Sequence, residues 1–331
     1  MGKNAFLSVE DLVVEYTSEG QVIHAVNQVS FQVERGKTLG LVGETGAGKT
    51  SIAKSILRIL PDPPAKIRAG AVRLDGENLL ELPETAMYKI RGSRVSMVFQ
   101  DPMTALNPVM RVGKQISEVI QLHNNISKQE AVKRAEAMLE MVGIPAERYN
   151  EYPHQFSGGM KQRVVIAIAL ACNPELLIAD EPTTALDVTI QAQVLEMITK
   201  LKQEKNMALI LITHDLGVVA EVCDEVAVVY AGEIVEYGTK EDLFDRPSHP
   251  YTKGLFGALP EMDADVERLS PITGLPPNPS SLPKGCYFSP RCPIADERCV
   301  SRHYELTEFQ EGHSCRCRDY VKQEVTHGSV G

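Results

Sequence analysis

The segment at residues 43–50, which reads Gly-Glu-Thr-Gly-Ala-Gly-Lys-Thr, restricts the possible folds more than any other part of the chain. It follows the apolar run Thr38–Val42 and precedes a helical stretch at Ser51–Leu60, which Pro61 ends. A glycine-rich loop between a strand and a helix directs backbone N–H groups and the positive helix N-terminus at phosphates. A chance glycine-rich turn is the alternative, and the strand before the loop argues against it. The residues predicted to bind nucleotide here are Gly43, Glu44, Thr45, Gly46, Ala47, Gly48, Lys49, Thr50 and Ser51.

A second run supplies carboxylates that suit the same chemistry. Lys49 would reach the β- and γ-phosphates, and the Thr50 hydroxyl would ligate Mg²⁺. The apolar run at residues 176–179 ends in Asp180 and Glu181, and strand ends are where an α/β sheet presents its ligand groups. Asp180 suits the Mg²⁺ shell, and Glu181 suits orienting and deprotonating an attacking water. Alone, such a run is more typical of a solvated strand end, but the phosphate-binding loop upstream favours the catalytic role.

Short strand-like runs alternate with helical segments along most of the chain. One helix is expected after Ser127, which forms a capping box with Glu130, and Gly143 is expected to end it. The alternation predicts an α/β fold with a parallel sheet and crossover helices. The strand-like runs are Leu7–Val14, Ala25–Val33, Thr38–Val42, Ala71–Leu74, Val95–Phe99, Leu176–Ala179, Ala208–Thr213 and Ala227–Tyr230.

A second potential anion site begins at Ser157, directly before the apolar helix expected at Val164–Ala171. Ser157, Gly158 and Gly159 offer free N–H groups at a helix start, and Gln162 follows them. One ATP does not need two anion sites in one chain. We therefore expect the site at Ser157 to bind the γ-phosphate of an ATP molecule held by another subunit. A serine N-cap with a flexible entry is the alternative.

These motifs resemble those of the ABC (ATP-binding cassette) ATPase family over about residues 6–240. The resemblance implies an α/β, P-loop NTPase fold, with a RecA-like core, an antiparallel β subdomain and a helical signature subdomain at about 100–170. Residues 43–50 look like the Walker A motif, and the strand that ends at Glu181 looks like Walker B. Residues 157–162 look like the signature, although Phe156 and Met160 depart from its usual sequence.

The same resemblance assigns roles to residues elsewhere in the cassette. Gln100 looks like the glutamine of the Q-loop, which senses Mg²⁺ and the transmembrane partner, and residues 184–187 resemble the D-loop. His214 resembles the switch histidine that contacts the γ-phosphate. Tyr16 fits the aromatic residue that stacks on adenine, and simple packing of a strand tyrosine is the alternative. The implied catalytic residues are Glu181, His214 and Gln100, and the implied Mg²⁺ ligands are Thr50, Gln100 and Asp180.

Charge and hydropathy narrow the class of protein. The net charge of −10 argues against a nucleic-acid partner, because neutralising phosphates needs a basic face. No run approaches the roughly 20 apolar residues that span a bilayer, and the N-terminus has no signal-peptide core. We therefore expect a cytosolic protein unless a partner holds it at a membrane.

The C-terminal part narrows the family further. Prolines crowd residues 241–285, where we expect a linker or extended arm. Residues 248–255, the pair at 276–277 and the run from Gly285 to Pro293 resemble blocks of oligopeptide and dipeptide importer ATPases. Residues 286–331 are expected to form a small irregular cysteine-rich extension.

Five of the seven cysteines lie in that extension. A cysteine cluster in a reducing cytosol indicates a metal site rather than disulfides, and four thiolates suit either a four-iron cluster or Zn²⁺. The resemblance implies an iron–sulfur (4Fe–4S) cluster, and its spacing favours Cys317 over Cys315 as the fourth ligand. The predicted ligands are Cys286, Cys292, Cys299 and Cys317.

The whole pattern implies an ATP-hydrolysing subunit of a peptide importer at the cytoplasmic face of the membrane. Its implied partners are two permease subunits, a second related ATPase in a homo- or heterodimer, and indirectly a substrate-binding protein. Two rivals are a soluble ABC ATPase that works without a permease and a nucleotide-responsive scaffold without catalysis. The complete set Lys49, Asp180, Glu181 and His214 argues against the scaffold.

Overall fold

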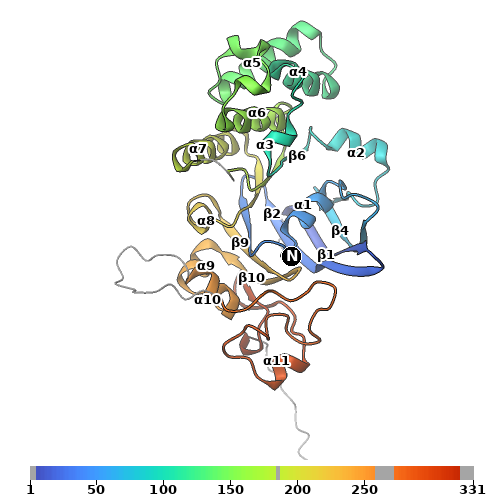
Figure 1. Cartoon of the computed structure of the whole chain (residues 1–331), viewed down its shortest axis with the longest axis vertical. Helices are drawn as coiled ribbons and strands as arrows, with labels where there is room; N and C mark the ends of the chain where they lie inside the picture. The colour runs from blue at the N-terminus through green and yellow to red at the C-terminus, as the bar shows by residue number, and fades with distance from the viewer. Residues whose placement is uncertain (1–4, 184–186, 258–271, 321–331) are drawn as a thin grey trace, which may run out of the picture.

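The computed structural model describes residues 5–183, 187–257 and 272–320. Residues 184–186 of the expected D-loop and two prolines of the expected arm, Pro260 and Pro271, lie outside this part of the chain. Figure 1 shows a helical region above a central sheet, with the C-terminal extension below it. Among the described residues, no helix combines the length and apolar character needed to cross a membrane.

An antiparallel sheet of four strands, in the order β2-β1-β4-β5, covers one side of the molecule. Its strands are β1 (Ala5–Ser18), β2 (Gln21–Glu34), β4 (Ala65–Leu74) and β5 (Glu77–Asn78). The first two are longer than their apolar runs, because cross-strand hydrogen bonds continue past the buried positions.

The main sheet has the order β11-β12-β10-β9-β3-β8-β7-β6. Its strands β9, β3, β8, β7 and β6 are parallel, whereas β10 and β12 pair antiparallel with their neighbours. The predicted parallel sheet is therefore a mixed one. The strands are β3 (Thr38–Val42), β6 (Val95–Val98), β7 (Leu176–Asp180), β8 (Ala208–Ile212), β9 (Glu225–Tyr230), β10 (Glu233–Thr239), β11 (Thr307–Gln310) and β12 (His313–Cys315).

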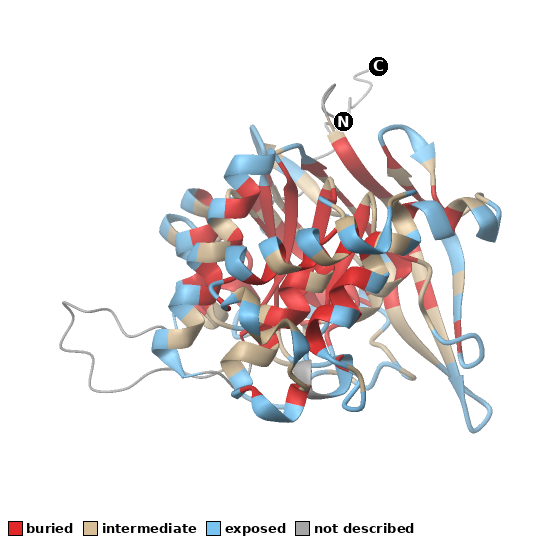
Figure 2. Cartoon of the chain, turned by 90° about the horizontal axis from the view of Figure 1, so that it is seen from above, coloured by how far each residue is buried: buried red, intermediate tan, exposed pale blue. Residues whose placement is uncertain are grey.

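The parallel strands are buried on both faces, because alternate side chains enter two separate cores. In β8, Leu209 and Leu211 join the core beneath the helices, whereas Ile210 and Ile212 join the core shared with the antiparallel sheet. Figure 2 shows this buried interior and the exposed outer faces of the helices. The uninterrupted apolar runs of these strands follow from burial on both sides.

The helices surround this sheet. The cap expected for α5 forms by half: the Ser127 hydroxyl accepts from the Glu130 N–H at 3.2 Å, but the Glu130 carboxylate pairs with Arg134 at 2.9 Å. The helix expected to reach Leu60 ends at Ile56, because Arg58 adopts a left-handed conformation. The helices are α1 (Lys49–Ile56), α2 (Glu84–Ile90), α3 (Pro102–Ala105), α4 (Val112–His123), α5 (Lys128–Met141), α6 (Gly158–Leu170), α7 (Val188–Lys205), α8 (Leu216–Val222), α9 (Lys240–Asp245), α10 (Pro250–Phe256) and α11 (Glu297–Ser301), with 3₁₀ turns at Ala146–Asn150, Pro153–Gln155 and Arg318–Tyr320.

The region after residue 240 is more regular than its prolines suggested. The segment expected as an arm contains α9 and α10, and Pro250 occupies the first turn of α10, where a proline costs no hydrogen bond. The extension expected to be irregular contributes β11 and β12, and Cys315 of β12 pairs with Glu236 of β10. The extension is therefore joined to the main sheet.

Candidate nucleotide-binding site

The phosphate-binding loop connects β3 to α1 at the carboxyl edge of the parallel strands. Gly43 and Gly48 have φ values of 148° and 105°, in the region that favours glycine. A Cβ on Gly43 would lie 2.1 Å from the Val229 carbonyl oxygen, and one on Gly48 would lie 2.3 Å from the Ala25 carbonyl oxygen. The spacing of glycines therefore reflects both backbone conformation and close approach to neighbouring strands.

Lys49 lies at the start of α1 and is 6% exposed. Its ammonium donates to the carbonyl oxygens of Gly43 at 2.7 Å and Glu44 at 3.0 Å. Burial lowers the pKa of Lys49, and the nearby carboxylates of Glu181 and Asp180 oppose that shift. The carbonyl groups of the loop thus hold the Lys49 ammonium against the loop, where it could bind an anion.

Asp180 ends β7 and is 3% exposed. Burial raises the pKa of its carboxyl group, and a hydrogen bond from Thr50 opposes that shift. An Mg²⁺ ion would favour the ionised form. The Thr50 hydroxyl and this carboxylate are oxygen donors of the kind that Mg²⁺ prefers, so the pair fits the predicted ion.

Glu181, Gln100 and His214 meet at the same edge. Glu181 has a φ of 47°, and its N–H donates to the Ile212 carbonyl at 2.8 Å, so the chain turns sharply after β7. One carboxylate oxygen of Glu181 accepts from the Gln100 amide at 2.8 Å, and the other lies 3.3 Å from His214 Nδ1. Gln100 and His214, which follow β6 and β8, are thereby held against the carboxylate of Glu181, which follows β7.

A cavity of about 310 Å³ opens over this edge, within the range usual for small-molecule sites. It brings together nine of the residues predicted for ATP, its metal and catalysis, whereas Gly43, Glu44, Ala47 and Asp180 are not in its lining. The lining residues are Ala25, Thr45, Gly46, Gly48, Lys49, Thr50, Ser51, Gln100, Glu181 and His214. Ala25 was not predicted, and nothing in its sequence context marks it.

Tyr16 lies beside the cavity rather than in its lining. Its hydroxyl is 3.0 Å from the Ser51 hydroxyl, and its ring packs against the core shared by the two sheets. Its role in stacking on adenine stays a prediction.

The signature residues lie away from this cavity. Ser157 caps α6, and its hydroxyl accepts from the Met160 N–H at 3.4 Å. Ser157 and Gly158 are exposed, and a Cβ on Gly158 would meet open space, whereas Gly159 packs against Ile190. Gln162 is 1% exposed, and neither polar atom of its side chain has a hydrogen-bond partner among the described residues. The helix start is therefore accessible, but the Gln162 side chain points into the protein.

The four predicted cysteine ligands line one small cavity in the extension, next to His249, Phe288, Tyr304 and Arg318. Cys315 is fully buried in β12 and is not part of that lining. In the described ranges, no group of three or more His, Cys, Asp or Glu side chains is placed to hold a metal ion. The structure therefore gathers four sulfurs around one space without converging them on a single point. The four are Cys286, Cys292, Cys299 and Cys317.

The backbone around these sulfurs is organised in a repeated way. The sulfurs of Cys286, Cys292 and Cys317 each accept a hydrogen bond from the N–H two residues further on. Burial raises the pKa of the Cys286 thiol to about 11, and that hydrogen bond opposes the shift. N–H groups aimed at sulfur stabilise thiolates and are one way proteins tune iron–sulfur clusters, so the donor set fits the predicted group.

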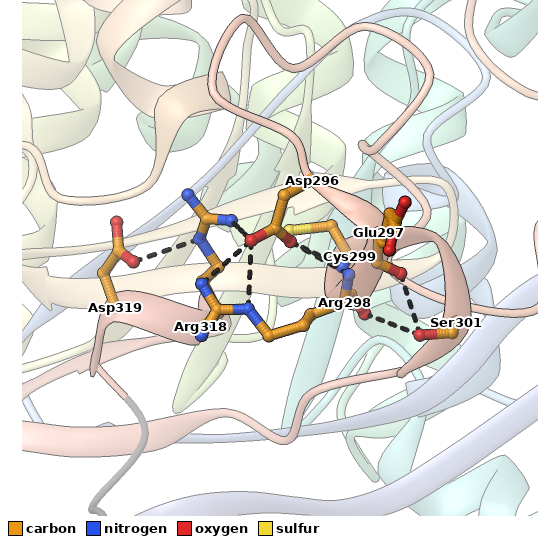
Figure 3. A network of polar contacts seen from close by, with 7 residues as sticks. All are labelled: Asp296, Glu297, Arg298, Cys299, Ser301, Arg318 and Asp319. Carbon is orange, nitrogen blue, oxygen red and sulfur yellow. Dashed lines mark hydrogen bonds and ion pairs between the residues drawn. The ribbon is translucent and has the colours of Figure 1, made fainter.

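One carboxylate ties two sides of this cavity together. Asp296 accepts from the N–H groups of Arg298 and Cys299 at the start of α11, and its carboxylate pairs with Arg318 (Figure 3). The hydrogen bonds from the Arg298 side chain, at 3.0 and 2.8 Å, are the main reason that the pKa of Asp296 is lowered. Because Arg318 follows Cys317, the network holds the segments that carry two of the four cysteines.

The sequence reasoning missed the contact between the extension and the phosphate-binding loop. Arg291 forms a bidentate ion pair with Glu44, and the Tyr251 hydroxyl accepts from the Glu44 N–H at 2.9 Å. Tyr251 and Arg291 each lie more than 200 positions from Glu44 in the sequence, so no local pattern could have revealed these contacts.

Comparisons with known proteins agree with this geometry. A family model described as ABC transporter matches residues 26–184, and one described as Oligopeptide/dipeptide transporter, C-terminal region, matches residues 235–299. The dipeptide transport ATP-binding protein DppD of Bacillus subtilis (strain 168) is 49% identical over 94% of this chain and 93% of its own. The oligopeptide transport ATP-binding protein OppD of Escherichia coli (strain K12) is 49% identical over 97% of this chain and 95% of its own.

Solved structures agree on the cassette fold. The ATP-binding cassette MJ0796, solved as a dimer in a post-hydrolysis state with ADP and Pi, has a TM-score of 0.64 at 26% identity. That match covers 71% of this chain and 98% of the cassette. The chain therefore belongs to the ABC transporter ATPases, among the oligopeptide and dipeptide transport ATP-binding proteins.

Proposed function

We propose that this chain is the ATP-hydrolysing subunit of a peptide importer. The observation that carries the proposal is the single edge of parallel strands at which Lys49, Glu181 and His214 line one cavity. The carboxylate of Asp180 lies close enough to Lys49 to influence its pKa. The names of its relatives as dipeptide and oligopeptide transport proteins supply the substrate class.

The residues divide the work according to their chemistry. The loop N–H groups and Lys49 bind the phosphates. The residues that would hold Mg²⁺ are Thr50, Asp180 and Gln100. Bound Mg²⁺ neutralises charge that develops on the phosphates. Glu181 orients the water and accepts its proton, and His214 contacts the γ-phosphate. Because Gln100 and His214 both contact Glu181, each can report the state of the site to that carboxylate.

The site is completed by a second ATPase. The exposed helix start at Ser157 and Gly158 lies outside this chain's own nucleotide cavity, which suits an anion held by another subunit. The related cassette solved as a dimer supports that arrangement. Closure of the pair would exclude water from two ATP molecules and align each Glu181 for hydrolysis. The partner is a related ATPase or a second copy of this chain.

Transport requires two membrane permease subunits, which the region after Gln100 would contact and which would hold this chain at the cytoplasmic face of the membrane. Exposed apolar side chains near that region, Phe99 at 41% and Val109 at 82%, suit such a contact. A substrate-binding protein outside the membrane would deliver the peptide to the permeases.

The first experiment is a membrane pull-down with a tagged Glu181→Gln chain in ATP and Mg²⁺, with captured proteins identified by mass spectrometry. The substitution removes the base but keeps the size of the side chain, so we expect a trapped, ATP-bound closed state. Recovery of two multi-span permeases and a second ABC ATPase is the expected result. Recovery of ribosomes or DNA-repair factors would support the rival soluble ATPase and refute transport.

The ATPase itself is tested separately. Lys49→Ala is expected to abolish nucleotide binding, and Glu181→Gln is expected to retain binding but lose hydrolysis by a factor of at least about 100. Normal steady-state turnover in Glu181→Gln would remove that residue from its catalytic role.

We also propose that Cys286, Cys292, Cys299 and Cys317 hold an iron–sulfur cluster that links the segments of the extension. Their common cavity and the N–H groups aimed at three of the sulfurs support this. Chain purified without oxygen should contain iron and acid-labile sulfide and absorb visible light. Cys317→Ala should lose these signals, whereas Cys315→Ala, the same change outside the cavity, should keep them. Stoichiometric zinc without iron would favour the single-metal alternative.

A further inference from the structure

The C-terminal extension reaches the phosphate-binding loop through one ion pair. Arg291 donates from its two terminal nitrogens to the two carboxylate oxygens of Glu44, at 2.8 and 2.9 Å. The Arg291 side chain is only 4% exposed and that of Glu44 is 29% exposed. Parallel hydrogen bonds from a guanidinium to a carboxylate are among the strongest polar contacts, and burial protects them from screening.

Arg291 is held in place independently of Glu44. Its Nε donates to the Thr273 carbonyl at 3.1 Å, and one terminal nitrogen lies 3.4 Å from the Tyr230 hydroxyl. Phe288 stands edge-on to the Tyr230 ring, with centroids 5.2 Å apart. A guanidinium fixed on several sides loses little freedom when it binds a carboxylate. The extension therefore presents Arg291 to the loop in a set orientation.

Every polar group of Glu44 is engaged. Its N–H donates to the Tyr251 hydroxyl, its carbonyl accepts from Lys49, and its carboxylate binds Arg291. Tyr251 is fully buried in α10. A shift of Glu44 would consequently move a carbonyl that now positions the Lys49 ammonium.

Charge gives this contact a consequence for ligand binding. Glu44 places a carboxylate in a loop whose N–H groups would be directed at a polyphosphate. The negative charges of the carboxylate and of the phosphates would repel each other. The ion pair neutralises that carboxylate and directs it toward the extension. Hydrogen bonding to Glu44 raises the pKa of Arg291 further above its usual range, so the neutralising charge is present at every working pH.

We propose that Arg291 is a positioning residue of the nucleotide site: it holds the Glu44 carboxylate away from the phosphates and keeps the loop in its binding conformation. The C-terminal extension thereby sets the affinity of the cassette for nucleotide. The inference rests on the proposed binding of ATP by residues 43–50 and does not depend on what occupies the cysteine cavity.

The test is a double-mutant cycle on the full chain, with the dissociation constant of a fluorescent ATP analogue in Mg²⁺ as the readout. Arg291→Gln leaves the carboxylate unpaired and is expected to weaken binding on the order of tenfold. Glu44→Gln is expected to bind more tightly than Arg291→Gln, because it has no carboxylate charge to neutralise. The double variant should bind within about threefold of Glu44→Gln.

Three further measurements separate positioning from simple folding support. Arg291→Lys should fall between the unsubstituted chain and Arg291→Gln, because a point charge replaces a planar fork. Arg302→Gln, the same change at an exposed site of the extension, should bind normally. Thermal unfolding of every variant reports whether the extension remains folded.

The outcomes are distinct. Equal weakening in Arg291→Gln and in the double variant would show that Arg291 acts only through the fold and would overturn the inference. Unchanged affinity in Arg291→Gln would overturn it as well, while leaving the proposed ATPase intact. Failure of the unsubstituted chain to bind nucleotide would refute the proposed function together with the inference.

Discussion

Glu236→Gln should loosen the attachment of the C-terminal extension to the main sheet. Glu236 of β10 is fully buried and accepts three hydrogen bonds. They come from the Ser248 N–H at 2.7 Å, the His249 N–H at 2.8 Å and His313 Nε2 at 2.8 Å. The two N–H groups precede α10, and His313 belongs to β12, so one carboxylate joins three segments.

The magnitude follows from that geometry. A glutamine keeps one acceptor oxygen and places an NH₂ group against at least one buried N–H donor. Losing a hydrogen bond to a charged group and leaving its donor unsatisfied costs about 2–3 kcal/mol. If opening of the extension is the event that exposes β12, its amides should exchange with solvent roughly 30- to 150-fold faster.

Hydrogen exchange followed by mass spectrometry measures this directly on peptides that cover residues 304–320. Glu305→Gln, the same change at an exposed position of the extension, is the matched control and should leave exchange unchanged. Exchange in Glu236→Gln within about threefold of the unsubstituted chain would refute the argument that this carboxylate joins the three segments.

Three further experiments test local features of the fold. Ser127→Ala removes the cap hydrogen bond of α5 and should lower the free energy of unfolding by about 1 kcal/mol, measured in urea. Gly113→Ala should destabilise the protein by about 1–3 kcal/mol, because a Cβ at that position would lie 2.0 Å from the Tyr149 ring. Gly158→Ala is the control and should be tolerated in the same assay, because a Cβ there would meet open space. Burial raises the pKa of the Cys223 thiol to about 12, so at pH 8 only about one molecule in ten thousand carries the thiolate. Iodoacetamide should therefore modify Cys223 only after unfolding. Rapid labelling of the folded protein would contradict this.

The main chemistry of the chain could be predicted from short segments of its sequence. Residues 43–50 need glycine at defined positions because the loop turns through left-handed conformations and touches neighbouring backbone. The run that ends at Asp180 and Glu181 is apolar because both faces of β7 are buried. Where local backbone geometry dictates residue type, the pattern is readable without the fold.

Other features depended on how distant segments pack. The proline-rich region formed two short helices. The second tolerates Pro250 because that residue lies in its first turn, and Glu236 from another strand accepts the N–H groups that precede it. For the fourth ligand of the proposed cluster, the family spacing favoured Cys317, and the neighbouring Cys315 was the alternative. In the fold, β12 buries Cys315 while Cys317 faces the common cavity.

Sequence patterns thus determined the loop, the strand-end carboxylates and the serine cap of α5, since each depends on neighbours within a few residues. Only the tertiary structure decided that Gln100, Glu181 and His214 share one cluster and that Arg291 pairs with Glu44. Those contacts arise from the order of strands in the sheet and from the return of the extension onto it. No local pattern records them, because the energy of such contacts depends on side chains that meet only after the chain has folded.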